Sequence, residues 1–187
     1  MKGRLGKGMI SKETIEKKLE GLPIFEYAFF DTRELSFYKN VRKICELECP
    51  RYGKTWSCPP AVGSLDECES RCEDYKSGFV FSTVSFVEDS AILEDALKTR
   101  QEHMEIVNEM KERIFAEEDV LVLTAESCDL CDTCTYPEKN CRYPEKMYPC
   151  IESHGILVTE ICEENKMTFL LDHQTVTWFC LILYNKA

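Results

Sequence analysis

The segment SCDLCDTCTYPEKNCRYP, residues 127–144, places four cysteines in the spacing C-x2-C-x2-C-x6-C. These cysteines are Cys128, Cys131, Cys134 and Cys141. Thiols at this density form disulfides, bind a zinc ion or bind an iron–sulfur cluster. In each case the fold must bring the thiols together, so this segment constrains the structure more than any other.

The redox environment decides between disulfides and metal. The chain has 12 cysteines among 187 residues, which is long enough to bury a core without disulfide support. Its first residues are basic and contain no apolar signal-peptide core, and no stretch reaches the ~18 apolar residues of a membrane span. We therefore expect a cytoplasmic protein without membrane association, whose thiolates hold metal.

The spacing of the downstream cysteines distinguishes zinc from iron–sulfur. A C-x2-C pair curls the backbone so that both thiolates converge on one centre. Zinc sites usually combine two such pairs across a long loop, whereas three ligands in one C-x2-C-x2-C run suit the separate iron corners of a 4Fe-4S cluster. The spacing thus favours a 4Fe-4S cluster, with zinc as the alternative. Nearby, Cys150 is interpreted as a buried, inert thiol rather than a spare ligand.

An upstream segment, CELECPRYGKTWSCPP, supplies a second group of thiols. They belong to Cys45, Cys49 and Cys58. A proline directly after a cluster ligand turns the chain away and leaves no N–H unpaired, which suits the sequence Cys58-Pro59-Pro60. Tyr52 and Trp56 lie within this segment, where they either shield a metal from water or pack as ordinary core residues.

Two further cysteines follow on a predicted helix. Ser64 and Glu67 form a capping-box pair, which predicts a helix over 65–76. Cys68 and Cys72 then share one helix face. Five thiols compete for four places in the upstream group, and we prefer Cys68 over Cys72 as the fourth ligand. A cluster with three protein ligands and one open iron is the alternative.

Hydrophobic periodicity predicts one α/β domain over residues 11–187, after a loose leader of residues 1–10. Strands are predicted at 25–30, 36–44, 78–86, 119–125, 155–161 and 175–184, and helices at 12–20, 65–76 and 90–116. The strand–helix–strand order between 78 and 125 indicates a βαβ unit whose strands are parallel neighbours. We expect a mixed β-sheet flanked by helices, with the cysteine-rich stretches 45–72 and 128–150 in loops at its edge.

The net charge of −11 disfavours nucleic acid as a partner, since phosphate binding needs a basic surface. The acidity either serves solubility or directs the protein to a basic redox partner protein.

Several other side chains are weighed as ligands. His103 lies ~100° from the apolar stripe of its predicted helix, so we expect it to be exposed. His154 is considered as a metal ligand or as a hydrogen-bond donor to a ligand, and His173 is expected in an exposed turn. Cys162 and Cys180 are expected to pack as small apolar residues.

Arg142 and Lys146 follow the downstream cysteines closely. They either donate hydrogen bonds to a negative cluster and raise its reduction potential, or are solvated at the surface.

The stretch CPRYGKTWSCPP, followed by CDLCDTCTYPEKNCRYPEKMYPCIESHGI, resembles a family of cysteine-rich bacterial and archaeal proteins described as predicted metal-binding proteins. The resemblance extends from about Cys45 to Tyr184. It implies metal binding, as iron–sulfur, in mostly anaerobic organisms, and implies no particular reaction. The family pattern falls on Cys45, Cys49, Cys58, Cys128, Cys131, Cys134 and Cys141. Cys68, Cys72 and Cys150 fit it less regularly.

Three functions fit these observations. The first is a protein with one or two 4Fe-4S clusters that transfers electrons in an anaerobic cytoplasm. The second is an enzyme whose upstream cluster has an open iron that acts on a small molecule or transfers sulfur. The third is a scaffold module stabilised by zinc.

Overall fold

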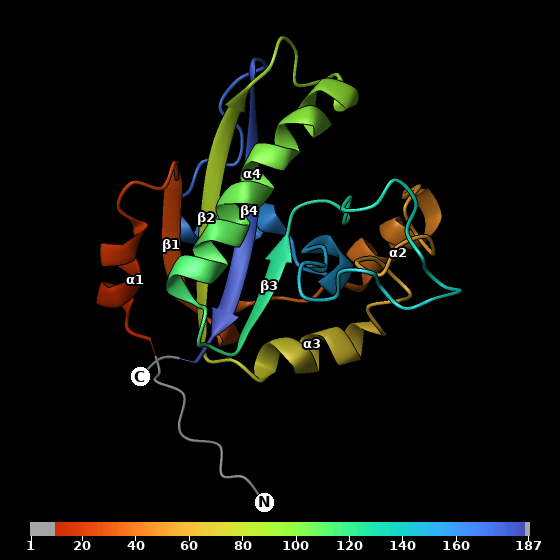
Figure 1. The fold of residues 1–187 in the computed structure, drawn as a ribbon, viewed down its shortest axis with the longest axis horizontal. Coiled ribbons are helices and arrows are strands. Elements are labelled where there is room, and N and C mark those ends of the chain that lie inside the picture. Colours follow the sequence, from red (N-terminus) through yellow and green to blue (C-terminus); the bar gives the residue numbers. More distant parts are fainter. Residues whose placement is uncertain (1–9, 186–187) are drawn as a thin grey trace, which may run out of the picture.

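A four-stranded sheet lies at the centre of the protein (Figure 1), whose computed structural model describes residues 10–185. The strands, in spatial order, are β1 (Glu26–Asp31), β2 (Ser77–Phe86), β4 (Thr175–Tyr184) and β3 (Val120–Thr124). All three neighbouring pairs are antiparallel. The single α/β domain predicted from the sequence is confirmed.

The strand pairing differs from the predicted βαβ unit. β2 and β3 both run antiparallel to β4, so they are parallel to each other, but β4 lies between them. The prediction that β2 and β3 are neighbours was therefore wrong. Parallel pairing is limited, among residues 10–185, to an isolated bridge between Thr124 and Cys150, so the sheet is less mixed than expected.

The central position of β4 follows from its composition. Its residues alternate between two cores: Cys180 and Ile182 face one, Leu181 and Leu183 face the other. These four side chains are fully buried. A strand that is apolar on both faces is stable only where helices cover both faces of the sheet.

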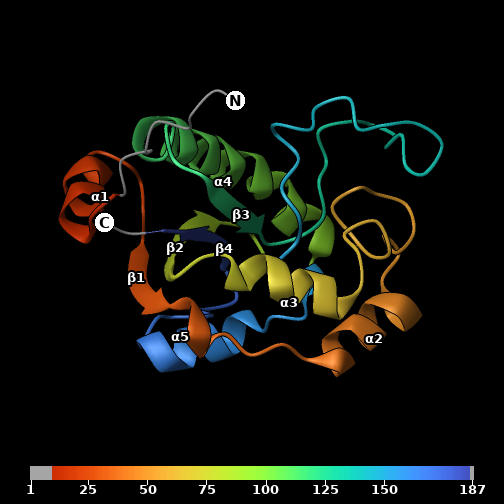
Figure 2. The same cartoon turned by 90° about the horizontal axis from the view of Figure 1, so that it is seen from below.

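Helices cover both faces of the sheet (Figure 2). α4 (Leu93–Ile114) and α1 (Lys12–Leu19) pack against one face, while α3 (Leu65–Glu73) and α5 (Val158–Asn165) pack against the other. α2 (Lys39–Glu48) lies beyond the β3 edge, next to the cysteine-rich loops (Figures 1 and 2). Within residues 10–185, no helix combines the length and apolarity needed to cross a membrane.

Two predicted strands are helical. Most of 36–44 belongs to α2, and 155–161 leads from the short 3-10 helix η2 (Glu152–His154) into α5. In α5 the apolar residues Val158, Ile161 and Cys162 recur at helical spacing and are buried together. Short apolar runs of this kind fit either a strand or a helix, and only the tertiary packing decides between them. Both strand predictions were therefore wrong.

The two helix caps predicted from the sequence are confirmed. Ser11 caps α1 by accepting a hydrogen bond from the backbone N–H of Thr14, and Ser64 and Glu67 form a complete capping box at α3. Residues 1–9 of the predicted leader lie outside the described residues. Ile10, the tenth residue of that leader, is buried in the core beneath α4.

Candidate metal centre

The cysteine-rich segments gather beside β3, one of the two edge strands of the sheet (Figure 1). α2 carries Cys45, and Cys49 is its C-cap. The loop that follows β3 returns to the sheet edge, where the Thr124–Cys150 bridge closes it. All 12 cysteines are free thiols. The fold therefore brings reduced cysteines from three distant parts of the chain to one edge of the sheet.

The first site is a cavity of about 260 Å³. Four thiols line it: Cys45, Cys49, Cys58 and Cys150. The remaining wall includes Glu126, Glu152 and Arg51. The volume far exceeds the ~10–15 Å³ that one water molecule needs. The first site can therefore accommodate a group larger than a single ion.

Cys150 belongs to the first site although the sequence suggested an inert thiol. Its Sγ donates a hydrogen bond to Glu152 Oε2 at 2.7 Å, and its backbone N–H donates to the Ser57 carbonyl at 3.1 Å. Burial raises the pKa of the Cys150 thiol and that of the Glu152 carboxyl. No local spacing connects Cys150 with Cys58, because Cys150 reaches the cavity through tertiary contacts with Ser57 and Thr124.

Cys68, the preferred fourth ligand, does not line the first cavity. It is fully buried behind it, with its Sγ 3.7 Å from Arg42 Nη1 and 3.8 Å from Arg71 Nη1. Cys72 is buried in the core beneath α5, where burial raises its pKa to about 12. Cys162 is buried in the same core, as expected from the sequence.

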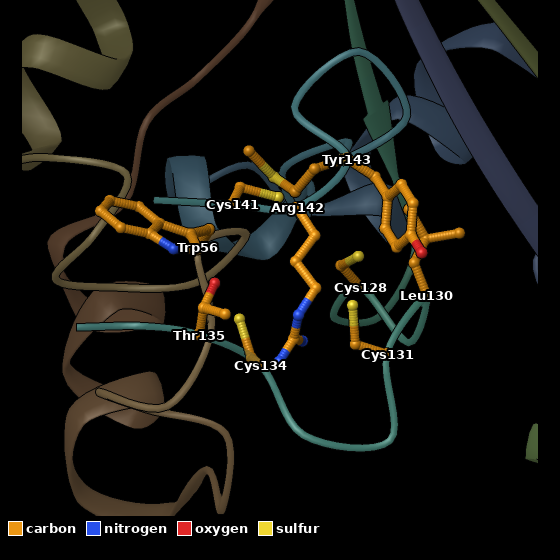
Figure 3. A pocket seen from close by; sticks show the side chains of 10 residues that line it. Trp56, Cys128, Leu130, Cys131, Cys134, Thr135, Cys141, Arg142 and Tyr143 are labelled. Carbon is orange, nitrogen blue, oxygen red and sulfur yellow. The ribbon is translucent and has the colours of Figure 1, made fainter. Parts of the chain in front are cut away.

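The second site is formed by the downstream group (Figure 3). Its four half-buried thiols are those of Cys128, Cys131, Cys134 and Cys141. Their sulfur atoms surround the side chain of Arg142, and the space left between them is about 20 Å³. Trp56, Leu130 and Tyr143 contribute apolar surface around the thiols. The structure thus brings together all four cysteines of the C-x2-C-x2-C-x6-C motif.

Arg142 is part of this second site. Its Nη1 donates to the Thr133 carbonyl at 2.8 Å, and a hydrogen bond with Cys131 is the main cause that raises the pKa of its guanidinium. The other basic candidate, Lys146, is exposed and does not line the site. A cation among four thiols compensates the negative charge that they gain as thiolates.

A buried arginine on α4 binds the loop that carries the second site. Arg100 of α4 is buried, and its Nη1 lies 2.5 Å from Asp129 Oδ1. Its Nε also donates to the Ala125 carbonyl at 3.3 Å. The charge of Arg100 lowers the pKa of Cys128, although burial is the larger effect and raises it. The sequence spacing of Arg100 gave no indication that it contacts this site, because it lies far from the cysteines in the sequence.

The two sites share walls. Trp56 lines the second site and Cys58 the first, while Ser127 lines the first and Cys128 the second. Ser57 lies fully buried between them, and its Oγ accepts a hydrogen bond from the Cys128 N–H at 2.8 Å. Two residues of chain span at most ~7 Å, so the sites are next to each other.

Of the three histidines, none lines either cavity. His154 is fully buried, and its Nε2 lies 2.9 Å from Arg71 Nη1. His103 is buried, with its Nδ1 2.8 Å from Thr83 Oγ1, so its predicted exposure was wrong. It faces the sheet between α4 and β4, because a helix lying flat on a sheet buries a wide face. His173 is exposed in a turn, as expected.

As the side chains lie, no three His, Cys, Asp or Glu residues between 10 and 185 form a group that would hold a metal ion. A family model described as "Predicted metal-binding protein (DUF2284)" matches residues 28–184. The chain belongs to the DUF2284 family. In this DUF2284 protein the match spans β1 to β4 and includes both sites. No curated protein and no solved structure matches the chain significantly.

Proposed function

We propose that this DUF2284 protein holds a 4Fe-4S cluster at each site and transfers electrons between them in an anaerobic cytoplasm. The observation that carries the proposal is the pair of adjacent four-thiol cavities, which share the segments 56–58 and 127–128. Clusters that are neighbours exchange electrons without large structural change, and no separate substrate pocket is required.

The donor atoms support iron–sulfur at both sites. Each site offers four cysteine sulfurs and no histidine, which is the ligand set of a 4Fe-4S cluster. At the first site we assign Cys45, Cys49, Cys58 and Cys150 as ligands, with Cys150 in the place first given to Cys68. Carboxylates at the first cavity do not compete well for iron in such clusters, because sulfide-bridged iron prefers thiolate.

The environment of the thiols supports a resident cluster rather than solvent-exposed reactivity. Burial is the main cause that raises the pKa of Cys45, Cys58 and Cys128, so these thiols keep their protons until a metal displaces them. Aromatic and apolar side chains around the second site shield bound sulfide from water.

A redox partner protein is expected to deliver or accept the electrons. The net charge of −11 supports a partner with a basic docking surface, whose association would weaken as ionic strength rises.

Anaerobic purification with iron, sulfide and zinc analysis tests the proposal. About eight irons and eight sulfides per chain are expected for two clusters. Cys162→Ala serves as the control, because Cys162 packs in the core and its loss should not change the metal content. Zinc without acid-labile sulfide would contradict the proposal and leave the zinc-stabilised scaffold.

One observation favours an enzyme as a second candidate. The first cavity is much larger than the space in the second site, about 260 Å³ against about 20 Å³, and its wall carries Glu152 and Arg51. A cluster with an open iron at the first site would leave room for a small molecule. Added small anions or thiols should then change the absorption and EPR spectra of the first cluster, whereas a cluster with four thiolates should not respond.

A further inference from the structure

Two arginines from different helices meet behind the first site. Arg42 lies on α2, three residues before the first-site cysteine Cys45, and Arg71 lies on α3. Their Nη1 atoms both contact the sulfur of Cys68, at 3.7 and 3.8 Å. Two guanidinium groups are thus held around one buried thiol.

The other donors of these arginines are bound by neutral backbone carbonyls. Arg42 donates to Gly63 O at 2.7 Å and to Ser153 O, and Arg71 donates to Val62 O at 2.9 Å. Across residues 10–185, the ion pairs of the structure involve neither arginine. Their position is fixed by hydrogen bonds, but their charge has no carboxylate partner in direct contact.

The titratable groups that touch the arginines carry no negative charge, although three carboxyl groups lie nearby: Glu67 interacts with Arg71, and Glu126 and Glu152 line the first cavity. Arg71 donates to His154 Nε2, and burial lowers the pKa of His154 to about 4, so the imidazole is neutral. Burial raises the pKa of Cys68, which keeps this thiol protonated. The Glu67 carboxylate accepts the Ser64 N–H at 2.7 Å in the capping box. The arginine pair therefore places two half-buried positive charges, without direct ion pairs, behind the first cavity.

This positive region is in contact with the wall of the first site. Ser153, which accepts from Arg42, also lines the first cavity. His154 Nδ1 lies 3.3 Å from the carbonyl oxygen of Cys150. The cavity thiols therefore experience the arginine charge.

We infer that Arg42 and Arg71 raise the reduction potential of a cluster held at the first site. This inference rests on the proposed function. A 4Fe-4S core with four thiolates is an anion that gains one negative charge on reduction, and nearby positive charge favours the reduced form. The effect is large where water is partly excluded.

The second site has a cation of its own in Arg142, whose side chain lies among the four thiols (Figure 3). The hydrogen bonds of Arg42 and Arg71 go to residues that do not line the second site. Loss of either arginine charge should therefore change the potential of the first cluster and leave that of the second unchanged.

Redox titration of the full chain under anaerobic conditions, followed by EPR, tests whether the two arginine charges set the potential of the first cluster. In Cys131→Ala the second cluster is removed, which assigns the remaining signal to the first site. We expect Arg42→Gln and Arg71→Gln each to lower the potential of the first cluster by a tenfold change in the one-electron equilibrium, ~59 mV, and to leave that of the second cluster unchanged. Arg33→Gln is the matched control, because Arg33 is a surface residue with a side chain that is 88% exposed, and it should leave both potentials unchanged.

A charge-keeping variant separates charge from structure. Arg42→Lys retains the charge but loses the paired donors, so it should keep the wild-type potential of the first cluster. The inference is overturned if the glutamine variants keep the first cluster at its wild-type potential. If the glutamine variants lose that cluster, the Arg42→Lys potential decides: a wild-type value supports the inference and a tenfold shift overturns it. A wild-type protein without iron and sulfide would instead refute the proposed function.

Discussion

Cys150 and Cys68 are both buried thiols near the first site, but only Cys150 lines its cavity. Cys68 faces two guanidinium groups behind the cavity wall. The choice between them therefore depends on which thiol can reach a cluster without moving a helix. Cys150 is already in place, whereas Cys68 would have to leave Arg42 and Arg71.

Paired alanine variants test this assignment. Cys150→Ala should remove about half of the iron and sulfide, because a first-site ligand is lost and the second site is untouched. Cys68→Ala should keep the full iron content and lose stability only, by about 1–2 kcal/mol for a small buried side chain. The opposite pattern of iron loss would return Cys68 to the ligand set.

A second residue-scale prediction concerns pH. Burial and, to a smaller extent, Arg100 lower the pKa of His103 to about 3. In the unfolded chain the histidine has its ordinary pKa of ~6.5, so it binds a proton that the folded protein does not bind. The free energy of unfolding therefore falls as the pH drops below that value. Between about pH 7.5 and about pH 5.5, protonation of His103 in the unfolded chain should lower the free energy of unfolding by on the order of 1.4 kcal/mol.

Urea unfolding of wild type and His103→Gln at both pH values measures this effect. The difference in free energy of unfolding between the two proteins should shrink or change sign at the lower pH. There the unfolded wild type gains a proton on His103, and the variant has no such group. His173→Gln, at an exposed position, should show no such dependence. A constant difference between wild type and His103→Gln would show that the imidazole titrates normally in the folded protein.

At the scale of elements, Gly155 connects η2 to α5 and lets two distant segments approach. Its φ of +76° lies in the left-handed region, and its carbonyl accepts the Tyr38 N–H at 2.8 Å. A Cβ at this position would lie 2.6 Å from Leu65 Cδ1 and 3.2 Å from the Tyr38 carbonyl oxygen. This glycine therefore fixes the start of α2 and the start of α3 against the wall of the first site.

Gly155→Ala should lower the free energy of unfolding by about 2–3 kcal/mol, from backbone strain together with the steric clash. Gly21→Ala is the matched control, because Gly21 also has a positive φ of +84° but a Cβ at this position would have no atom within 4 Å. Its free energy of unfolding should fall by about 1 kcal/mol, from backbone strain alone. Equal losses in chemical denaturation would mean that the close contact with Leu65 relaxes freely.

The long, periodic elements were predictable from the sequence, and the short ones were not. β2, β4 and α4 occupy nearly the predicted ranges, because ten or more residues of consistent pattern leave one interpretation. By contrast, α2 carries exposed apolar residues such as Ile44 and Leu47, which imitate the composition of a strand. Its residues Val41, Ile44 and Cys45 nevertheless recur at helical spacing, a pattern that the strand prediction overlooked.

At the scale of the whole molecule, the sites were predictable where their cysteines are close in sequence. The four thiols of the second site fall in one short segment and meet in the structure. The first site combines α2, the loop carrying Cys58 and the segment after the second site, and only the tertiary fold reveals Cys150. The position of β4 was unpredictable for the same reason, because the last strand enters the sheet between two strands that precede it.

Metal binding should also support the stability of the whole molecule. Because thiolate ligation and folding are coupled, Cys131→Ala should lose the second cluster and unfold at a lower temperature than the loaded wild type. Calorimetry of both proteins, with iron analysis of each sample, tests this expectation. A variant that retains full iron and sulfide would remove Cys131 from the ligand set.

The loop that holds the second site leaves the sheet at Thr124 and returns to the same residue, whose N–H donates to Pro149 O and whose carbonyl accepts from the Ile151 N–H, both at 3.0 Å. Entry and exit thus coincide at one point of the edge strand. Insertions or deletions inside the loop would leave the register of every strand unchanged. The arrangement makes the segment around Cys131, Cys134 and Cys141 a replaceable loop, which evolution or an engineer could lengthen or recode for another metal without shifting the pairing of the strands.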